Sequence, residues 1–378
     1  MCQISVLLDN TGTASNLLKN INKLLETKPK ALTLLVASGN GFSKEELDPL
    51  LTDLNIPVSG GIFHKIIFKE ELLSKGSIVI AWYKDIIITN YKNIENTDSI
   101  KDLIGVTKQP KNTRNIGEYL LFIDGAVSRI EENLDALYKK NGFRATFAGG
   151  AAGMASMESS PCIISNDGLL SNAMQTIATN YKSRITTTHG FEKNSGPHLV
   201  TSSDKTKINT LNYEPIVPFY IIHNKENGIN ELKNTEFDSF FTHYPLGIEN
   251  LDGEILVRDP IKSNKDSIEY IGNIPEYSRV HILNGTTDSI RDEVDKELYS
   301  LKLRDEKNVD ACFIFSCVNR DDGDNKNNSK EIKMINQHLE GSENIIGALS
   351  LGEFATNEAR LLQLHSKSIV ISQLMNEA

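Results

Sequence analysis

One histidine lies in an aromatic segment of the sequence, SFFTHYPLGIEN. His243 is followed directly by Tyr244, Pro245 and Leu246. An imidazole beside aromatic and apolar side chains can be the ligand of a metal or of a bound cofactor, and the proline restrains the backbone that presents it. The competing interpretation is a packed histidine that fills space next to a turn. These four residues form a candidate binding site, with His243 as the candidate metal ligand.

Two arginines and one glutamate are candidates for recognising a ligand by charge. Arg258 and Arg320 each follow an apolar run. We expect their guanidinium groups to emerge at strand ends, where they could hold a carboxylate. The alternative is an ion pair with a neighbouring acid, Asp259 or Asp321. Glu353 is expected to be buried, where it either binds a ligand amine or accepts bonds from backbone amides.

Motifs of known catalytic machinery are missing from the sequence. There is no GxSxG, HExxH, P-loop or GxGxxG pattern, and acids, bases and a nucleophile are not concentrated in any short region. The cysteines form no CxxC pair, so buried, inert thiols are favoured over a metal site. They are Cys2, Cys162, Cys312 and Cys317. The sequence therefore favours a binding protein over an enzyme.

Three stretches of the chain share one order of elements. In the first, the apolar run 31–37 precedes a helical pattern at 43–55, then a glycine-rich strand, and a last strand at 76–83. A second stretch, 118–154, repeats the strand, the helix and the glycine-rich strand. A third, 310–374, repeats the whole order. Apolar runs that end in small residues are typical of buried strands. The sequence predicts an α/β fold of repeated strand-helix-strand units, with central sheets flanked by helices.

Chain length and glycine placement suggest where a ligand could bind. With 378 residues the chain exceeds what one core usually supports, which predicts two lobes. Glycines at strand ends, as in AGGAAG and GALSLGE, either leave room for a ligand or serve only sheet packing. We expect them to open a cavity between the lobes.

Charge and hydropathy exclude several classes of partner. The formal net charge is −10 and no basic stripe interrupts it, which disfavours nucleic acid. No apolar run is long enough to cross a bilayer, and the first residues lack the pattern of a signal peptide. We expect a cytoplasmic protein without a membrane partner.

Several segments, taken together and in order, resemble the FIST family of bacterial sensory proteins. They are FAGGAAGM, HGFEKNSGPHLVT, HYPLGI, ILVRDP, CFIFSCVNR and IIGALSLGEFA. The resemblance implies a two-lobed fold, with a FIST N-terminal domain over residues 1–235 and a FIST C-terminal domain over residues 236–378. One departure is Met154, which stands where the family pattern GGxAGD has its acid.

The resemblance also implies a ligand-sensing module that reports to a signalling partner. No output domain follows in this sequence, so we expect a separate partner such as a histidine kinase, and leave an oligomer open. The most specific expectation is a haem-based nitric oxide sensor. Haem b would take His243 as its axial ligand, with His189 and His223 as alternatives, while Arg258 or Arg320 would hold a propionate.

Three other functions compete with this expectation. A FIST module could sense an amino acid or another small metabolite without haem. An enzyme whose catalytic residues are scattered would show no local motif. An adaptor could use the helix expected at 287–303, although Ile290, Val294 and Leu298 fit better as an inward-facing row.

Overall fold

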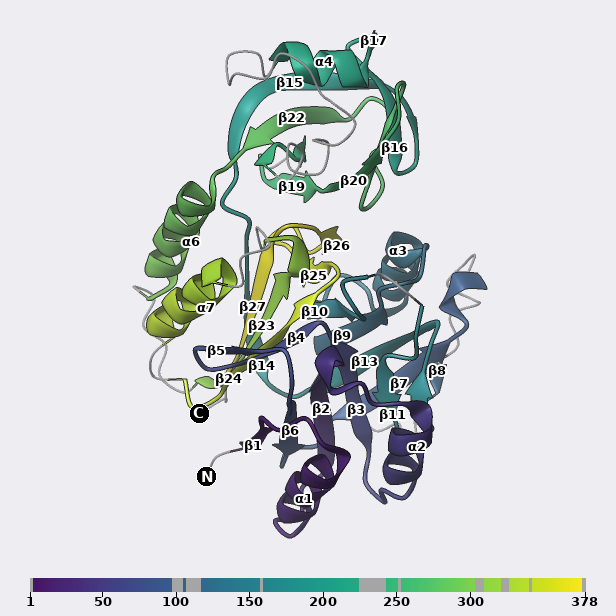
Figure 1. Cartoon of the computed structure of the whole chain (residues 1–378), viewed down its shortest axis with the longest axis vertical. Coiled ribbons are helices and arrows are strands. Elements are labelled where there is room, and N and C mark those ends of the chain that lie inside the picture. Colours follow the sequence, from purple (N-terminus) through teal and green to yellow (C-terminus); the bar gives the residue numbers. More distant parts are fainter. Residues whose placement is uncertain are drawn as a thin grey trace. The chain divides into compact units, whose positions relative to one another are not determined.

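The computed structural model divides the chain into two compact units. It describes residues 3–96, 105–106, 117–156, 159–223, 243–250, 253–302, 309–320, 326–339 and 342–375. The larger unit comprises residues 1–188, 298–364 and 369–378, and the smaller unit comprises 189–297 and 365–368. These limits differ from two consecutive halves of the chain, because the chain leaves the larger unit and later returns to it. Figure 1 follows this path by colour.

Three sheets build the larger unit, and in each of them neighbouring strands in space are often distant in the chain. In spatial order, the first sheet contains β1 (Ile4–Asp9), β6 (Ser77–Trp82), β2 (Ala31–Ala37), β3 (Val58–Phe63), β11 (Ile163–Ser165) and β12 (Gly168–Leu170). The second contains β26 (Leu362–His365), β25 (Glu353–Thr356), β10 (Thr146–Ala152), β9 (Glu118–Asp124), β13 (Ala173–Thr179), β7 (Ile87–Lys92) and β8 (Gly105–Val106). The third contains β14 (Lys182–Thr188), β27 (Ile369–Met375), β23 (Val309–Cys317), β24 (Ile345–Ser350), β4 (Lys65–Phe68) and β5 (Glu71–Leu73).

The three sheets repeat one arrangement. In each, a parallel strand pair is connected through a helix: β2 and β3 through α2 (Lys44–Thr52), β9 and β10 through α3 (Ile130–Asn141), β23 and β24 through α7 (Lys326–His338). A returning strand, β6, β13 or β27, pairs antiparallel with the leading strand. The α/β fold class and the repeated strand-helix-strand unit predicted from the sequence are confirmed.

Each repeat gives a hairpin to the sheet of another repeat, which the sequence pattern did not predict. The hairpin β4–β5 follows β3 in the chain but joins the third sheet, β11–β12 follows β10 but joins the first, and β25–β26 follows β24 but joins the second. This cyclic exchange ties the three repeats into one unit.

One glycine occupies the same register in each parallel pair. A side chain at Gly60, Gly149 or Gly347 would collide with the backbone carbonyl of the residue opposite, in β2, β9 or β23. Close approach of paired backbones therefore accounts for these three glycines. Sheet packing, one of the two interpretations drawn from the sequence, explains them.

Aromatic side chains from all three sheets meet in a common core. The ring of Phe122 lies edge-on to Phe63 at 5.6 Å and to Phe315 at 6.0 Å, measured between centroids. Trp82 stacks on Phe313 at 6.0 Å. Residues of all three sheets form this buried cluster. The protein's own side chains therefore fill the region where its sheets face one another.

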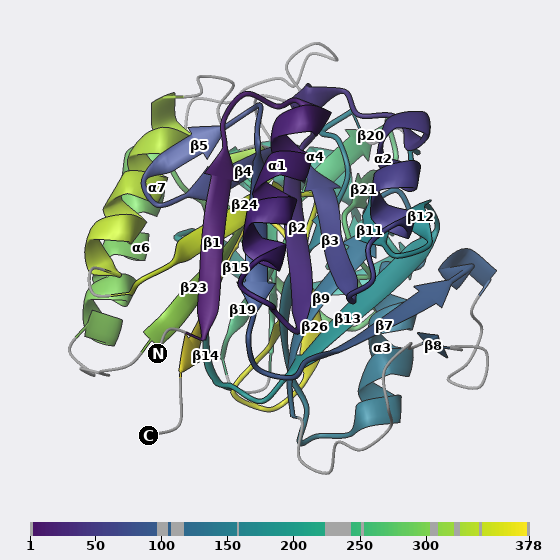
Figure 2. The same ribbon diagram turned by 90° about the horizontal axis from the view of Figure 1, so that it is seen from below.

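Helices cover the outer faces of the sheets. Figure 2 shows α1 (Ala14–Leu25) and α2 over the first sheet, where a second apolar cluster lies between helices and strands. Leu17 and Ile21 of α1 and Leu47 and Leu51 of α2 are buried there. Short 3₁₀ turns complete the unit: η1 (Ser38–Asn40), η2 (Ile94–Asn96) and η4 (Val318–Arg320).

A fourth sheet forms the smaller unit. Its order is β19 (Ile255–Arg258), β18 (Leu246–Glu249), β22 (Arg279–Asn284), β15 (Glu192–Asp204), β16 (Lys207–Leu211), β21 (Ile268–Tyr270) and β20 (Pro260–Ser263), with β17 (Glu214–Pro215) paired to β16. Helix α4 (Ile216–His223) packs on its apolar cluster, where the Tyr270 hydroxyl donates to that of Tyr220 at 3.2 Å.

Helix α6 (Thr287–Lys302) crosses the boundary between the units at Leu298. Val294 and Leu298 are buried, and Ile290 packs against an apolar cluster of the smaller unit. The inward-facing row expected from the sequence is confirmed. Among the helices in the described part of the chain, none combines the length and apolarity required to span a bilayer.

Candidate functional site

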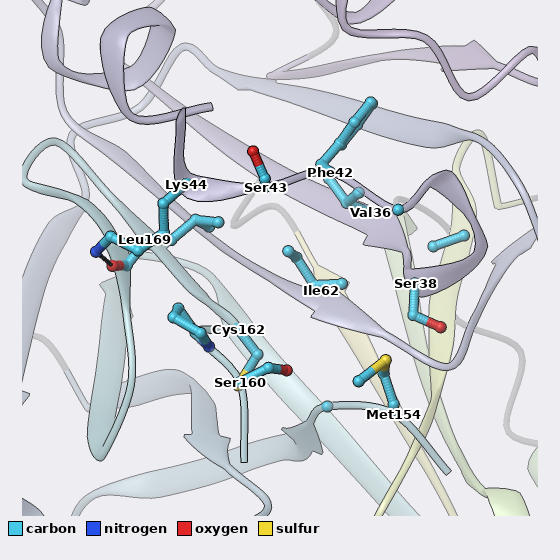
Figure 3. A pocket seen from close by; sticks show the side chains of 14 residues that line it. Val36, Ser38, Phe42, Ser43, Lys44, Ile62, Met154, Ser160, Cys162 and Leu169 are labelled. Atoms are coloured by element: carbon cyan, nitrogen blue, oxygen red, sulfur yellow. Dashed lines mark hydrogen bonds between the residues drawn. The ribbon is translucent and has the colours of Figure 1, made fainter. Parts of the chain in front are cut away.

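A pocket of about 300 Å³ opens in the larger unit beside the end of β2 (Figure 3). Its walls come from the loop between β2 and α2, from β3, and from the segment that connects β10 to the β11–β12 hairpin. The lining residues are Val36, Ala37, Ser38, Gly41, Phe42, Ser43, Lys44, Ile62, Gly153, Met154, Ser160, Pro161, Cys162 and Leu169. Two repeats therefore contribute to one cavity.

The first wall is a tight connection from strand to helix. After β2 the chain makes the 3₁₀ turn η1 and leaves it through Gly41, whose φ is +69° and which therefore suits glycine. Ser43 then begins α2 with a capping box, in which its backbone N–H donates to Glu46 Oε2 at 3.1 Å. This fixed start presents Ser43 and Lys44 to the pocket.

The second wall arrives from the neighbouring repeat. The N–H of Gly153 donates to the carbonyl of Ile62 at 2.8 Å, and the N–H of Ile62 donates to the carbonyl of Cys162, also at 2.8 Å. These two bonds fasten both ends of the 153–162 connection to β3. Met154 and Ser160 lie on this connection and reach the pocket.

A polar clamp holds the hairpin against α2 at the rim. Asp48 Oδ1 accepts the N–H of Leu169 at 2.7 Å, and Lys44 Nζ donates to the carbonyl of the same residue at 2.7 Å. Lys44 and Asp48 also pair with each other at 3.4 Å, one helical turn apart. This clamp fixes the distance between α2 and the β11–β12 hairpin.

The thiol at the base of the pocket is held in its neutral form. Burial raises the pKa of Cys162 well above its ordinary value, and the carboxylate of Asp124 adds to the shift. A protonated thiol is a poor nucleophile and a poor metal ligand. Cys162 therefore contributes a small, weakly polar surface, in line with the inert thiol expected from the sequence.

The lining groups suit a small molecule with an apolar body and one polar or anionic end. Val36, Ile62 and Met154 supply apolar surface, while Ser38 and Ser160 supply hydroxyls. The start of α2 brings the positive end of the helix dipole to the pocket, and Lys44, which is also paired with Asp48, adds a cation at the rim. A cavity of this size is at the small end of the range for ligand sites.

The structure places the histidine segment in the smaller unit, where most of it is packed. Leu246 is fully buried in the apolar cluster of that unit, and Tyr244 packs against the same cluster. Pro245 is buried, and its carbonyl accepts the N–H of Leu283 at 2.9 Å. His243 is half-buried, and its carbonyl accepts the N–H of Gly285 at 3.3 Å. Phe240 and Phe241, expected to flank His243, lie outside the described residues.

The packing corrects one part of the expectation for His243. Tyr244 and Leu246 were expected to offer a wall to a cofactor, whereas they contribute to the core beside β18. Leu246 is therefore covered by protein, whereas Tyr244 and His243 are both half-buried.

Arg258 also belongs to the smaller unit and is buried. Its Nε donates to the carbonyl of Asn273 at 3.2 Å. The neighbouring acid, Asp259, pairs with the buried Lys367 at 3.5 Å. The expected alternative partner of the arginine is therefore engaged by a lysine, and Arg258 is fixed at least in part by backbone carbonyls.

Arg320 and Glu353 lie in the larger unit, and both side chains are buried. Arg320 is buried and forms two bonds with Glu331 of α7, one of them from Nε to Oε2 at 3.1 Å. Burial alone would lower the pKa of Arg320, but Glu331 outweighs it and the pKa is raised. Arg320 thus forms a buried ion pair with Glu331, while Asp321, the acid considered as its alternative partner, lies outside the described residues. Glu353 is buried as predicted, and accepts a bond from Ser350 Oγ at 2.8 Å.

The remaining histidine candidates have protein partners. His189 Nδ1 accepts the N–H of Phe191 at 2.9 Å. His223 lies 5.0 Å from His198, between ring centroids, and its Nδ1 is 2.9 Å from the carbonyl of Phe219. Burial, followed by the charges of His223 and His281, lowers the pKa of His198 to about 4. Within the residues that the structure describes, no three His, Cys, Asp or Glu side chains are grouped to hold a metal.

Sequence reasoning missed the pocket, although two of its residues carried signals. Ser43 is the first residue of the helical pattern predicted at 43–55, and Met154 is the position that departs from the family pattern. Neither signal indicates that the two residues face one cavity. The pairing of β11 with β3, together with the bonds that Ile62 makes to Gly153 and Cys162, brings the second repeat to the first.

Comparison with protein families gives the family to which the chain belongs. Residues 31–214 match the FIST N domain and residues 222–356 match the FIST C domain. The chain therefore belongs to the FIST family, whose domains sense small molecules in signalling proteins. All lining residues of the pocket fall within the FIST N match. No curated protein matches the chain significantly.

Proposed function

We propose that this FIST protein senses a small metabolite bound in the pocket beside β2. The observation that carries the proposal is the pocket itself, a cavity of about 300 Å³ within the FIST N match and between two repeats. A ligand there would contact the β2–α2 loop and the 153–162 connection together. Binding would thus stabilise one relative placement of the two repeats, which is how a ligand shifts a conformational equilibrium.

We expect a ligand that carries a carboxylate or hydroxyl group on an apolar body. The first turn of α2 and Lys44 favour a negative end, and the thioether of Met154 favours an apolar body. Met154 stands where the family pattern has an acid, so a ligand amine that would pair with that acid finds no charge at this position. The proposal is thus narrower than amino-acid sensing in general.

The signalling partner and the compartment follow from the sensor class. We propose a separate signalling protein, such as a histidine kinase, as the partner and the cytoplasm as the compartment. We also propose that the chain binds its ligand without converting it, because the described lining residues supply hydroxyls, one cation and a protonated thiol but no pair of general acid and base.

A thermal-shift screen of small carboxylates and hydroxy compounds tests the proposal. A ligand at a hundred times its Kd should stabilise the folded protein by about 2.7 kcal/mol, which raises Tm. Met154→Leu preserves the apolar wall and should retain the shift. Met154→Asp places a carboxylate in the wall and should abolish the shift for anionic ligands.

Two results would contradict the proposal. One is a ligand whose shift is the same in the Met154→Asp variant as in the unmodified protein. The other is a ligand whose shift is the same in Ser160→Trp as in the unmodified protein, because tryptophan at this position fills the cavity and should lower the affinity of any true occupant.

A haem-based nitric oxide sensor is the second proposal. Its support is the place of His243 in the sequence, next to Tyr244 and Pro245, and its half-buried position in the smaller unit. The described residues that line the pocket beside β2 include no histidine, so this proposal does not use that pocket. Haem added to the purified protein should give a Soret band that His243→Ala removes. A spectrum that the variant leaves unchanged would exclude His243.

A further inference from the structure

Two exposed tyrosines of the smaller unit occupy turn positions that favour glycine. The first is in the two-residue loop between β16 and β17, where Leu211 pairs with Glu214. Asn212 has φ +51° and Tyr213 has φ +68°. A two-residue hairpin loop with positive φ at both positions is a type I′ turn, and its second position is usually glycine. Tyr213 stands at that second position.

The second tyrosine repeats this situation in a different turn. The N–H of Ser278 donates to the carbonyl of Pro275 at 3.2 Å, which closes a four-residue turn. Tyr277 is its third residue and has φ +67°. Positive φ at this position is the mark of a type II turn, which again favours glycine.

The two turns meet at one strand. The N–H of Tyr277 donates to the carbonyl of Val200 at 2.8 Å, and the N–H of Tyr213 donates to Thr201 Oγ1 at 2.9 Å. Val200 and Thr201 are consecutive residues of β15. Both tyrosine backbones are therefore anchored within one residue of each other along the strand.

Packing does not explain why tyrosine is present at either position. The side chain of Tyr213 is 81 % exposed and that of Tyr277 is 72 % exposed. A bulky residue with positive φ is strained, and an exposed ring gains little from the protein that could offset the strain. Strained residues persist where they serve a function, and tyrosine is one of the side chains that dominate protein interfaces.

The charges beside the tyrosines indicate the chemistry of the partner. Glu214 follows Tyr213, Glu276 precedes Tyr277, and both acids are exposed. Glu276 accepts the N–H of Ser203 through Oε1, which holds its carboxylate beside the second turn. A tyrosine ring next to a carboxylate suits arginine, whose guanidinium stacks on the ring and bonds to the acid. The net charge of −10 favours approach of a basic partner.

We propose that Tyr213, Tyr277, Glu214 and Glu276 form a docking surface for an arginine-bearing segment of a partner protein. The surface lies in the smaller unit, whereas the pocket beside β2 lies in the larger one. It therefore stands independently of the proposed ligand.

Fluorescence anisotropy with a labelled peptide, GRGRGRGRG, tests the surface on the full chain. We expect the peptide to bind the unmodified protein and the double variant Tyr213→Gly/Tyr277→Gly to bind it at least tenfold more weakly. Tyr299→Ala, which removes an exposed tyrosine of α6, should leave the affinity unchanged. The peptide GEGEGEGEG should not bind.

Each result decides for or against the surface. Equal affinity of the double variant and the unmodified protein, or no binding of the arginine peptide at 50 mM salt, would overturn the proposal. Thermal unfolding shows whether the two tyrosines are strained or stabilise the fold. If they are strained, the double variant should unfold at the same temperature as the unmodified protein or at a higher one. A lower unfolding temperature would make the tyrosines structural and would overturn the argument from strain.

Discussion

The first and third repeats of the larger unit end their leading strands alike and then use the adjoining space differently. Strand β2 continues into η1 and strand β23 into η4, each a three-residue 3₁₀ turn. In the first repeat the last turn residue, Asn40, bonds to the backbone of Gly76 at 2.7 and 2.9 Å, and the pocket lies beside the turn. In the third repeat the last turn residue, Arg320, is buried in an ion pair with Glu331.

The two repeats therefore share one backbone arrangement, and the side chain at the end of the 3₁₀ turn determines what the adjoining space contains. An amide at the end of the turn satisfies a nearby backbone segment and leaves the cavity to other groups. A guanidinium at the equivalent place requires a buried acid, because an unpaired charge in the interior is very costly. One scaffold thereby supports a binding site in one repeat and a structural ion pair in another.

The largest effect should come from breaking the ion pair of the third repeat. Glu331→Ala leaves Arg320 buried without its carboxylate, and should lower the free energy of unfolding by about 3–5 kcal/mol. Urea denaturation measures this loss. The double variant Arg320→Met/Glu331→Leu removes both charges and should recover most of it. A double variant as unstable as Glu331→Ala would show that packing, and not charge, holds the third repeat.

The next largest effect tests whether the repeats share one backbone. Gly60→Ala in the first repeat and Gly347→Ala in the third both place a Cβ against the carbonyl of the paired strand. Each should lower the free energy of unfolding by about 1–3 kcal/mol, the usual cost of overpacking. Gly41→Ala is the control, since a Cβ there meets no atom within 4 Å and only its positive φ is unfavourable. Equal losses at Gly41 and Gly347 would contradict the steric argument.

A smaller effect is expected at the polar clamp at the rim of the pocket, where Lys44 and Asp48 hold Leu169. Asp48→Ala removes the acceptor of the Leu169 N–H, and should lower the free energy of unfolding by about 1.5 kcal/mol. It should also weaken ligand binding, because the hairpin is then less firmly held. Asp53→Ala at the end of the same helix is the matched control and should change neither quantity. If Asp48→Ala left the ligand affinity unchanged, the clamp would have no part in ligand binding.

The sequence predicted the elements of this comparison better than their contacts. Apolar runs identified β2, β9 and β23, and Ser43, the first residue of the pattern at 43–55, identified the start of α2, because these signals are local. The hairpins β4–β5, β11–β12 and β25–β26 are short and pair with strands far along the chain, so no local pattern specifies their sheet. The same limit applies to the pocket, whose walls are joined only through that exchange.

The candidate residues show the same limit at the level of side chains. Burial of Glu353 could be predicted from its apolar neighbours, and it was confirmed. The partner of Arg320 could not, because Glu331 reaches it only through the packing of α7 on the sheet. For Tyr244 and Leu246, an apolar pattern fits a cofactor wall and a protein core equally well, and the structure shows the core.

The smallest effect concerns two buried thiols, that of Cys162 beside the pocket and that of Cys312 in the third repeat. Burial, together with Asp124, raises the pKa of Cys162 beside the pocket, and burial raises that of Cys312 in β23 to about 11. In the unfolded chain both thiols ionise near pH 8.5, so the unfolded state loses protons that the folded state keeps. Stability from these thiols is therefore complete below that pH and is lost as pH rises toward the folded pKa. At pH 9.5 the loss is about 1.4 kcal/mol for each thiol. Chemical denaturation at pH 7.5 and 9.5 should show that Cys162→Ala and Cys312→Ala each reduce the fall in stability between the two pH values. If both variants kept the full pH dependence, ionisation of these thiols would have no part in it, and the two repeats could not be compared by this route.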